Sequence, residues 1–349
     1  MDTDDPLSAA RAAVVWPVAL DPTGVDGPTR GAARGSRWRR SSHGLYVPAT
    51  VEADQPEQRI VEAAAILPEI GGVTGWAGLR WAGGVWFDGR GPQGQPRDVD
   101  LATCYEDVRT RPGKRVCQER LPPSELVDHD GVRMTLPVRS LLFVLRRAPD
   151  LRTAVIAADM AAYSDLVSLD EAWEYALAHP GWTGVPQARR ALLLAAENSW
   201  SPRETALRLV WTQDAGLGAP LCNSPVFDLE GRLIGVPDMV DPESGLLGEY
   251  DGVVHFVGPQ RAHDLGRLDR FRDHGLEPVV VVSDDMADRD RVVRRLLAGH
   301  ERARRRPASE RRWTTEPPPW WTPTDTVSLR RSLAATVARR LLAHRERAA

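Results

Sequence analysis

The sequence predicts a mixed fold, with an α+β region in the first half, a helical connector, and then an α/β domain with a mixed central sheet. Three observations predict it. Short strand-like stretches separated by turn residues dominate before residue 149, helical spacing continues over residues 150–196, and strand and helix patterns alternate after residue 200. At 349 residues the chain is long enough for two domains.

The first half divides into an arm and an α+β region. Residues 1–30 are rich in Asp, Pro, Gly and Thr, so we expect a loosely held, flexible arm there. Residues 31–148 begin with a short basic turn that enters a strand, and Gly44 allows a tight bend. Ile60 and Ala64 then lie on one face of a predicted helix, and Pro137 suits the first turn of another. Short strands are expected between these helices.

The second half begins with helices and then alternates strands with helices. In the helical connector, residues 149–200, Ser168 and Glu171 have the form of a capping box, which Ser201 and Glu204 repeat at the next helix start. Strands and helices are predicted in the domain at residues 201–306, with strands at 225–229, 233–240, 246–250 and 278–282 and helices at 261–274 and 289–306. Residues 307–349 form a Pro/Trp-rich segment and a final helix.

Composition excludes a few function classes. A net charge of -3 argues neither for nor against binding to nucleic acid. The single lysine is Lys114, so catalysis that needs a lysine in the second half of the chain is excluded. The cysteines form no C-x-x-C pair, which argues against a zinc knuckle or a disulfide framework. The sequence contains neither an apolar stretch of about 18 residues nor a signal pattern, so we expect a cytoplasmic protein with no membrane partner.

Acidic residues at the ends of two predicted strands are the candidate metal-binding and catalytic residues. Asp238 lies in an apolar stretch, and Glu249 and Asp251 end the next strand. Carboxylates on neighbouring strands repel unless a cation joins them, and a hard cation such as Mg²⁺ or Mn²⁺ prefers such oxygen ligands. Glu204, on the preceding helix, can orient a water, and His255 can act as a general acid or base. The alternative is a set of exposed hairpin carboxylates with a solvated histidine.

These residues also carry a resemblance, in the order Glu204, Pro237-Asp238 and Glu249-x-Asp251-Gly252-x-x-His255. The pattern, over about residues 200–300, resembles the PD-(D/E)XK nuclease superfamily, and more specifically its very-short-patch-repair (Vsr-like) and DUF559 branch. The resemblance implies a restriction-endonuclease-like fold in which Asp238 is the principal metal ligand. It also implies that Glu249 and Asp251 complete the metal-binding strand and that His255 assists the water or the leaving group.

The chain departs from this family pattern in two ways. The third superfamily position is commonly lysine and is Asp251 here, and the zinc-binding cysteines of the repair branch are absent. These departures leave open a degenerate nuclease fold without catalysis.

Arginines are the predicted contacts to DNA, because a guanidinium binds phosphate with two parallel hydrogen bonds. The candidates are Arg37, Arg39, Arg40, Arg203, Arg267, Arg270, Arg304 and Arg305. The alternative is that these arginines lie on solvated faces beside Asp and Glu partners.

A second resemblance concerns about residues 30–148. The stretches Arg37-Trp38-Arg39-Arg40…Gly44-Leu45-Tyr46-Val47 and Val73-Thr74-Gly75-Trp76-Ala77-Gly78-Leu79 are similar to AbiEi-type antitoxin proteins. The resemblance implies a winged-helix region and a partner protein from a toxin–antitoxin or defence operon, although no clear recognition helix precedes Arg37. The alternative is a small α+β scaffold with Trp76 and Trp81 in its core.

The leading expectation is a Mg²⁺-dependent DNA phosphodiesterase, endonuclease-like, that acts in DNA repair or defence. One alternative is a non-catalytic DNA-binding regulator of the antitoxin type with a degenerate nuclease fold. Another is an interaction scaffold that binds neither DNA nor metal.

Overall fold

A computed structural model of the chain describes residues 6–91, 93–104, 108–251, 259–343 and 345. These residues form two compact units. Unit 1 consists of residues 1–148 and 170–189, and unit 2 consists of residues 149–169 and 190–349. The chain therefore passes from one unit to the other three times, and each unit is described by itself.

Unit 1 begins with helix α1 (Pro6–Ala12) and a three-stranded antiparallel sheet in the order β1-β3-β2. Its strands are β1 (Val18–Ala19), β2 (Trp38–Ser42) and β3 (Leu45–Pro48). The predicted flexible arm thus contributes a helix and a strand. Gln58 binds the backbone of Val15 twice, at 2.9 Å each, and Leu7 is buried. These long-range contacts have no local sequence signal.

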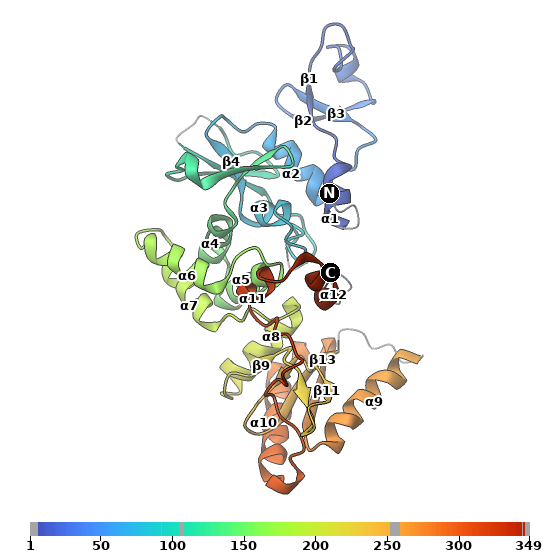
Figure 1. Cartoon of the computed structure of the whole chain (residues 1–349). Helices are drawn as coiled ribbons and strands as arrows, with labels where there is room; N and C mark the ends of the chain where they lie inside the picture. Colours follow the sequence, from blue (N-terminus) through green and yellow to red (C-terminus); the bar gives the residue numbers. More distant parts are fainter. Residues whose placement is uncertain (1–5, 92, 105–107, 252–258, 344, 346–349) are drawn as a thin grey trace. The chain divides into compact units, whose positions relative to one another are not determined.

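A five-stranded mixed sheet forms the body of unit 1, in the order β6-β5-β4-β8-β7. Figure 1 shows its strand β4 near α2 and α3. The strands are β4 (Gly71–Thr74), β5 (Val99–Thr103), β6 (Lys114–Gln118), β7 (Leu126–His129) and β8 (Val132–Thr135). Helices α2 (Pro56–Ala64), α3 (Gly75–Trp81) and α4 (Pro137–Arg147) accompany them. Trp76 and Trp81 are buried, and their indole N–H groups donate to the carbonyls of Asp98 and His129.

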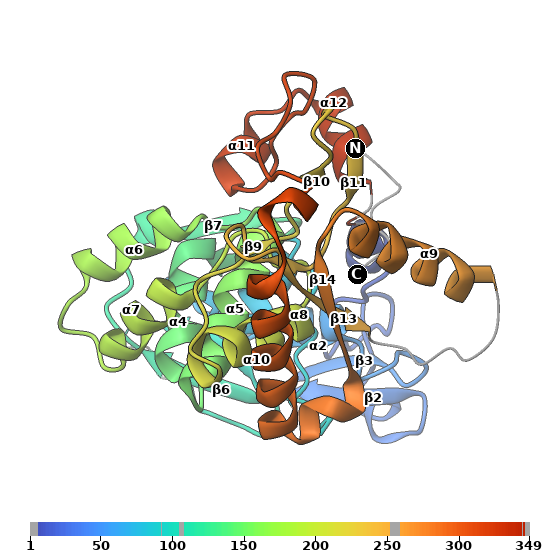
Figure 2. The same ribbon diagram turned by 90° about the horizontal axis from the view of Figure 1, so that it is seen from below.

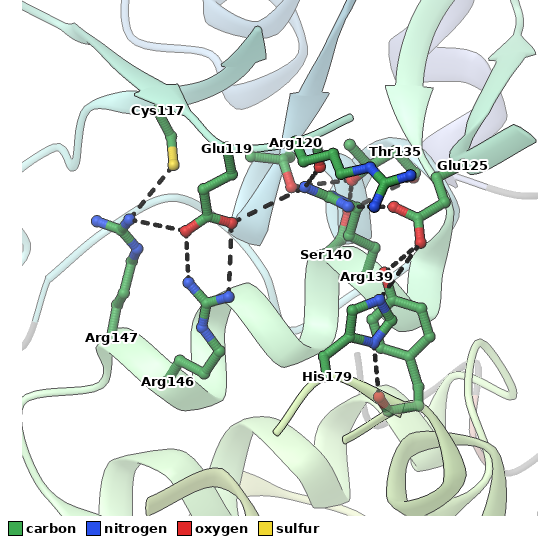
Figure 3. Close-up of polar contacts among 12 residues, drawn as sticks. Cys117, Glu119, Arg120, Glu125, Thr135, Arg139, Ser140, Arg146, Arg147 and His179 are labelled. Carbon is green, nitrogen blue, oxygen red and sulfur yellow. Dashed lines mark hydrogen bonds and ion pairs between the residues drawn. The ribbon is translucent and has the colours of Figure 1, made fainter. Parts of the chain in front are cut away.

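A polar cluster joins residues 170–189 to the rest of unit 1 (Figure 3). This segment contains most of α6 (Leu169–Ala178) and the start of α7 (Val185–Leu194). Arg146 of α4 ion-pairs with Glu119 at 2.5 Å and lies over the ring of Trp182 at 4.6 Å. Tyr175 donates its hydroxyl to Glu125 at 2.8 Å. Partly buried, charge-assisted contacts of this kind hold the segment against the rest of unit 1.

Unit 2 is built on a four-stranded mixed sheet in the order β14-β13-β12-β9. Strands β13 (Leu246–Asp251) and β14 (Glu277–Val282) are parallel, whereas β12 (Met239–Val240) pairs antiparallel with both β13 and β9 (Leu221–Cys222). A separate hairpin joins β10 (Val226–Phe227) and β11 (Leu233–Gly235). The mixed α and β character predicted from the sequence is confirmed.

Alternation along the strands divides the core of unit 2 between the two faces of its sheet. On one face, Met239 and Leu246 pack with Leu296 of α10 (Arg289–Arg305). On the other face, Val240 and Leu247 belong to a cluster with Phe271 of α9 (Pro259–Asp273). Figure 2 shows the two helices with the strands β13 and β14 between them.

Helix α8 (Pro202–Leu209) is anchored to α5 (Leu151–Tyr163) by a buried ion pair within unit 2. Asp159 of α5 is fully buried, and Arg208 of α8 donates to it at 2.6 Å. Thr205 and the backbone N–H of Ala196 also donate to the Asp159 carboxylate, each at 2.8 Å. This network fixes the helix that carries Glu204.

Two predicted elements are divided in the structure. The strand predicted over residues 233–240 becomes β11 and β12, separated at Pro237, because proline has no N–H to donate to a sheet. The final helix becomes α11 (Val327–Arg331) and α12 (Ala335–Leu342). In the part of the chain that the structure describes, no helix has both the length and the apolar character to cross a membrane.

Candidate carboxylate site

Strand pairing in unit 2 brings the segments of two predicted acidic residues side by side. Met239 of β12 pairs with Gly248 of β13, and Asp238 and Glu249 are the residues next to this pair on the two segments. The backbone N–H of Tyr250, the residue after Glu249, donates to the Asp238 carboxylate, so Asp238 lies beside this part of β13. Asp251 lies two residues beyond Glu249 and therefore on the same face of β13.

Asp238 has the most strongly perturbed environment of the predicted residues. Its carboxylate accepts a 2.6 Å hydrogen bond from the backbone N–H of Tyr250. Burial raises the pKa of Asp238 well above its ordinary value, and the neighbouring charges of Glu204 and Glu249 raise it further. The Tyr250 hydrogen bond and the charge of Arg267 act in the opposite direction without cancelling the rise. Burial and neighbouring negative charges disfavour the ionised form of a carboxyl group, and a nearby cation favours it.

Glu204 lies in the first turn of α8. Ser201 caps the helix by accepting from the Glu204 backbone N–H at 3.1 Å, as the S-x-x-E pattern predicts. The Glu204 carboxylate accepts from the backbone N–H of Trp200 at 2.9 Å and from the side-chain amide of Asn223 at 2.7 Å. Burial raises the pKa of Glu204, although both hydrogen bonds favour the ionised form.

Glu249 is buried and interacts with an arginine of α9. Only 4% of the residue is exposed, and its carboxylate ion-pairs with Arg267 at 2.8 Å. The same guanidinium donates to the carbonyl of Val236 at 3.3 Å. Arg267 therefore links α9 to β13 and to the segment that precedes β12.

Of the five predicted residues, Glu204 and Glu249 lie near enough to Asp238 for their charges to raise its pKa. Asp251 is exposed at the end of β13. His255 lies outside the residues that the structure describes.

The donor set fits a hard cation only in part. Within the described ranges, no group of three or more His, Cys, Asp or Glu residues is arranged to hold a metal ion. Mg²⁺, however, is commonly held by one or two carboxylates together with waters and substrate phosphates. Asp238 and Glu249, whose charges interact, are two carboxylates of this kind, and Mn²⁺ accepts the same oxygen ligands.

Sequence reasoning missed Asn198 and Asn223, which hold Glu204 in place. Asn223 is buried, has φ of 44° and follows directly after β9. Its neighbours, Asn223-Ser224-Pro225, are turn-forming residue types, and asparagine is enriched among residues with positive φ. The local turn could have been predicted from this signal, but its contact with a helix 19 residues earlier could not.

Two of the predicted DNA-contacting arginines pair with buried carboxylates, and two others also have partners: Arg305 ion-pairs with Glu301 at 2.6 Å, and Arg40 donates to the Ser42 carbonyl at 3.2 Å. Arg39 forms a double hydrogen bond with Glu62 of α2, at 2.6 and 2.9 Å, and Arg267 pairs with Glu249. In both arginines the carboxylate takes up guanidinium hydrogens that a phosphate would otherwise accept. The other six are exposed: Arg37, Arg40, Arg203, Arg270, Arg304 and Arg305.

Comparisons of the chain with protein-family models, with curated proteins and with solved structures found no match. What the chain does is therefore inferred from its own residues and their geometry.

Proposed function

We propose that the chain is a metal-dependent DNA phosphodiesterase, endonuclease-like, whose site is formed by Glu204, Asp238 and Glu249. The observation that supports the proposal is that Asp238 has two carboxylates as charged neighbours, Glu204 of α8 and Glu249 of β13. The restriction-endonuclease-like fold, the role in DNA repair or defence and a partner protein from a defence operon belong to the same proposal.

Charge balance supports a cation at this place. Glu249 has the guanidinium of Arg267, whereas Asp238 and Glu204 accept the hydrogen bonds described above from neutral amide groups. Like charges in a partly buried site raise one another's pKa values, and a divalent ion removes that penalty when it binds. The mixed sheet, with its acidic face turned toward α9, provides the rigid support that such a site needs.

The residues have separate roles in the proposed hydrolysis. Asp238 and Glu249 would hold Mg²⁺ or Mn²⁺, which supplies Lewis acidity at the phosphate and an activated water. Glu204, fixed by two hydrogen bonds, is placed to orient the attacking water. Water adds to phosphorus, the bond from phosphorus to the leaving sugar oxygen breaks, and that oxygen takes up a proton. Asp251 and His255 remain proposed contributors to metal binding and proton transfer.

A plasmid-nicking assay tests the proposal. Purified full-length protein is incubated with supercoiled DNA and Mg²⁺ or Mn²⁺, beside the Asp238→Asn variant and a matched control, Asp284→Asn, in which an exposed aspartate is changed. We expect nicking by the wild type and the control, dependence on the metal, and background nicking by Asp238→Asn. Equal nicking by all three proteins would rule out Asp238 as a metal ligand.

A second candidate function is favoured by the Arg267–Glu249 ion pair, which already supplies one cation to the site. We propose as the alternative a non-catalytic DNA-binding regulator with a degenerate nuclease fold. Its signature would be DNA binding that weakens steeply with salt, because phosphate contacts release counterions, together with no nicking in either metal.

A further inference from the structure

Asn223 connects the two elements that carry Glu204 and Asp238. Its backbone N–H donates to the carbonyl of Asp238 at 2.9 Å, so it continues the pairing of β9 with β12 by one residue. Its side-chain amide donates to the Glu204 carboxylate at 2.7 Å. One residue therefore contacts the strand through its backbone and the helix through its side chain.

Asn198 holds Asn223 in this orientation. The Asn223 side-chain nitrogen also donates to the Asn198 carbonyl at 2.8 Å, and the Asn198 side chain donates in return to the carbonyls of Asn223 and Cys222, at 3.1 and 2.8 Å. Both hydrogens of the Asn223 amide thus have acceptors, and the amide orientation is determined by this exchange. Both asparagines are buried, so water does not compete for these bonds.

The backbone conformation favours asparagine at this position. Asn223 has φ of 44°, in the left-handed region that asparagine tolerates better than most residues. Glycine would keep this backbone but remove the amide. Aspartate would keep the size but replace the donor to Glu204 with a second carboxylate.

We propose that Asn223 is a positioning residue for the proposed phosphodiesterase: it fixes the Glu204 carboxylate relative to Asp238. The inference rests on the proposed function of this site. Asn223 is thereby added to the proposed site as a residue that contacts neither metal nor substrate and acts through Glu204. Hydrogen-bonding partners that orient a metal site typically change activity by about 10–100-fold when removed.

The test compares Asn223→Gly and Asn223→Asp with the wild type in single-turnover nicking at saturating DNA and Mg²⁺. The control is Asp130→Gly, which puts glycine at a residue of unit 1 with the same φ of 44°. We expect both Asn223 variants to lose about 10–100-fold in rate. Their DNA affinity, measured in Ca²⁺, should be unchanged, and Asp130→Gly should keep the wild-type rate. The aspartate variant keeps the test valid if the glycine variant fails to fold.

A double-mutant cycle separates positioning from a general structural role. If Asn223 acts through Glu204, the double variant Glu204→Gln/Asn223→Gly should nick as slowly as Glu204→Gln alone. Rates that multiply in the double variant, or an Asn223→Gly variant as fast as the wild type, would overturn the inference while leaving the proposed function intact. Background nicking by the wild type itself would overturn the proposed function, and the positioning role with it.

Discussion

Replacing Asp238 with asparagine should stabilise the metal-free protein. Folding raises the pKa of Asp238, so the folded protein holds this proton more tightly than the unfolded chain does. The contribution of Asp238 to stability is therefore most favourable below its ordinary pKa and is lost as the pH rises through the folded-state pKa. Asparagine does not ionise, so the variant avoids this loss of stability at high pH. Its side-chain oxygen still accepts the hydrogen bond from Tyr250.

The expected size follows from the geometry of the carboxylates. Two unit charges about 6 Å apart at an effective dielectric constant of about 20 repel by about 3 kcal/mol. Arg267, at 2.8 Å from Glu249, offsets part of this repulsion, which leaves about 1–2 kcal/mol on Asp238. For a unit of about 150–250 residues, each kcal/mol changes Tm by about 2–4 °C. Asp238→Asn should therefore raise the Tm by about 2–8 °C at alkaline pH.

Thermal unfolding from acidic to alkaline pH, with and without Mn²⁺, measures this effect. The Tm advantage of Asp238→Asn should grow as the pH rises. In the wild type, a metal at about 100 times its Kd should add about 2.7 kcal/mol, or roughly 5–11 °C, and in the variant it should add little. A variant that is less stable than the metal-free wild type at alkaline pH would refute the charge argument. An equal metal response in both proteins would refute the metal assignment.

Two further predictions concern other parts of unit 2. Asp159→Ala leaves Arg208 buried without its carboxylate and should lower the free energy of unfolding by about 3–5 kcal/mol, measured by urea denaturation; a loss below about 1 kcal/mol would contradict a buried pair. Arg304→Ala removes an exposed guanidinium, and if Arg304 contacts DNA the slope of log affinity against log salt should fall by about 0.9. An unchanged slope would remove Arg304 from the DNA-binding set.

The parts of the site that depend on local pattern were predictable from the sequence. Ser201 and Glu204 have the spacing of a capped helix start, and the Ser201 cap is present. Asp238 directly precedes β12 and Glu249 lies within β13, and the antiparallel pairing of these two strands brings the two segments side by side.

The remaining parts depend on contacts between distant segments. Arg267 reaches Glu249 because α9 lies against one face of the sheet, and a helical pattern does not specify which arginine will face a buried acid. The contact of Gln58 with Val15 could not be predicted for the same reason. It holds in place the segment predicted to be a flexible arm. Pro237, by contrast, is a local signal whose effect on the strand could have been anticipated.

The interleaved course of the chain restricts how unit 2 can be produced as a fragment. A truncated protein that starts at Ser201 would lack α5, and with it the acidic partner of Arg208 on the helix that bears Glu204. A fragment that starts at Pro149 retains Asp159 but also carries residues 170–189, whose apolar surfaces pack within unit 1. Excising those residues and bridging the gap with a short glycine–serine linker is the design that preserves the native anchoring of α8.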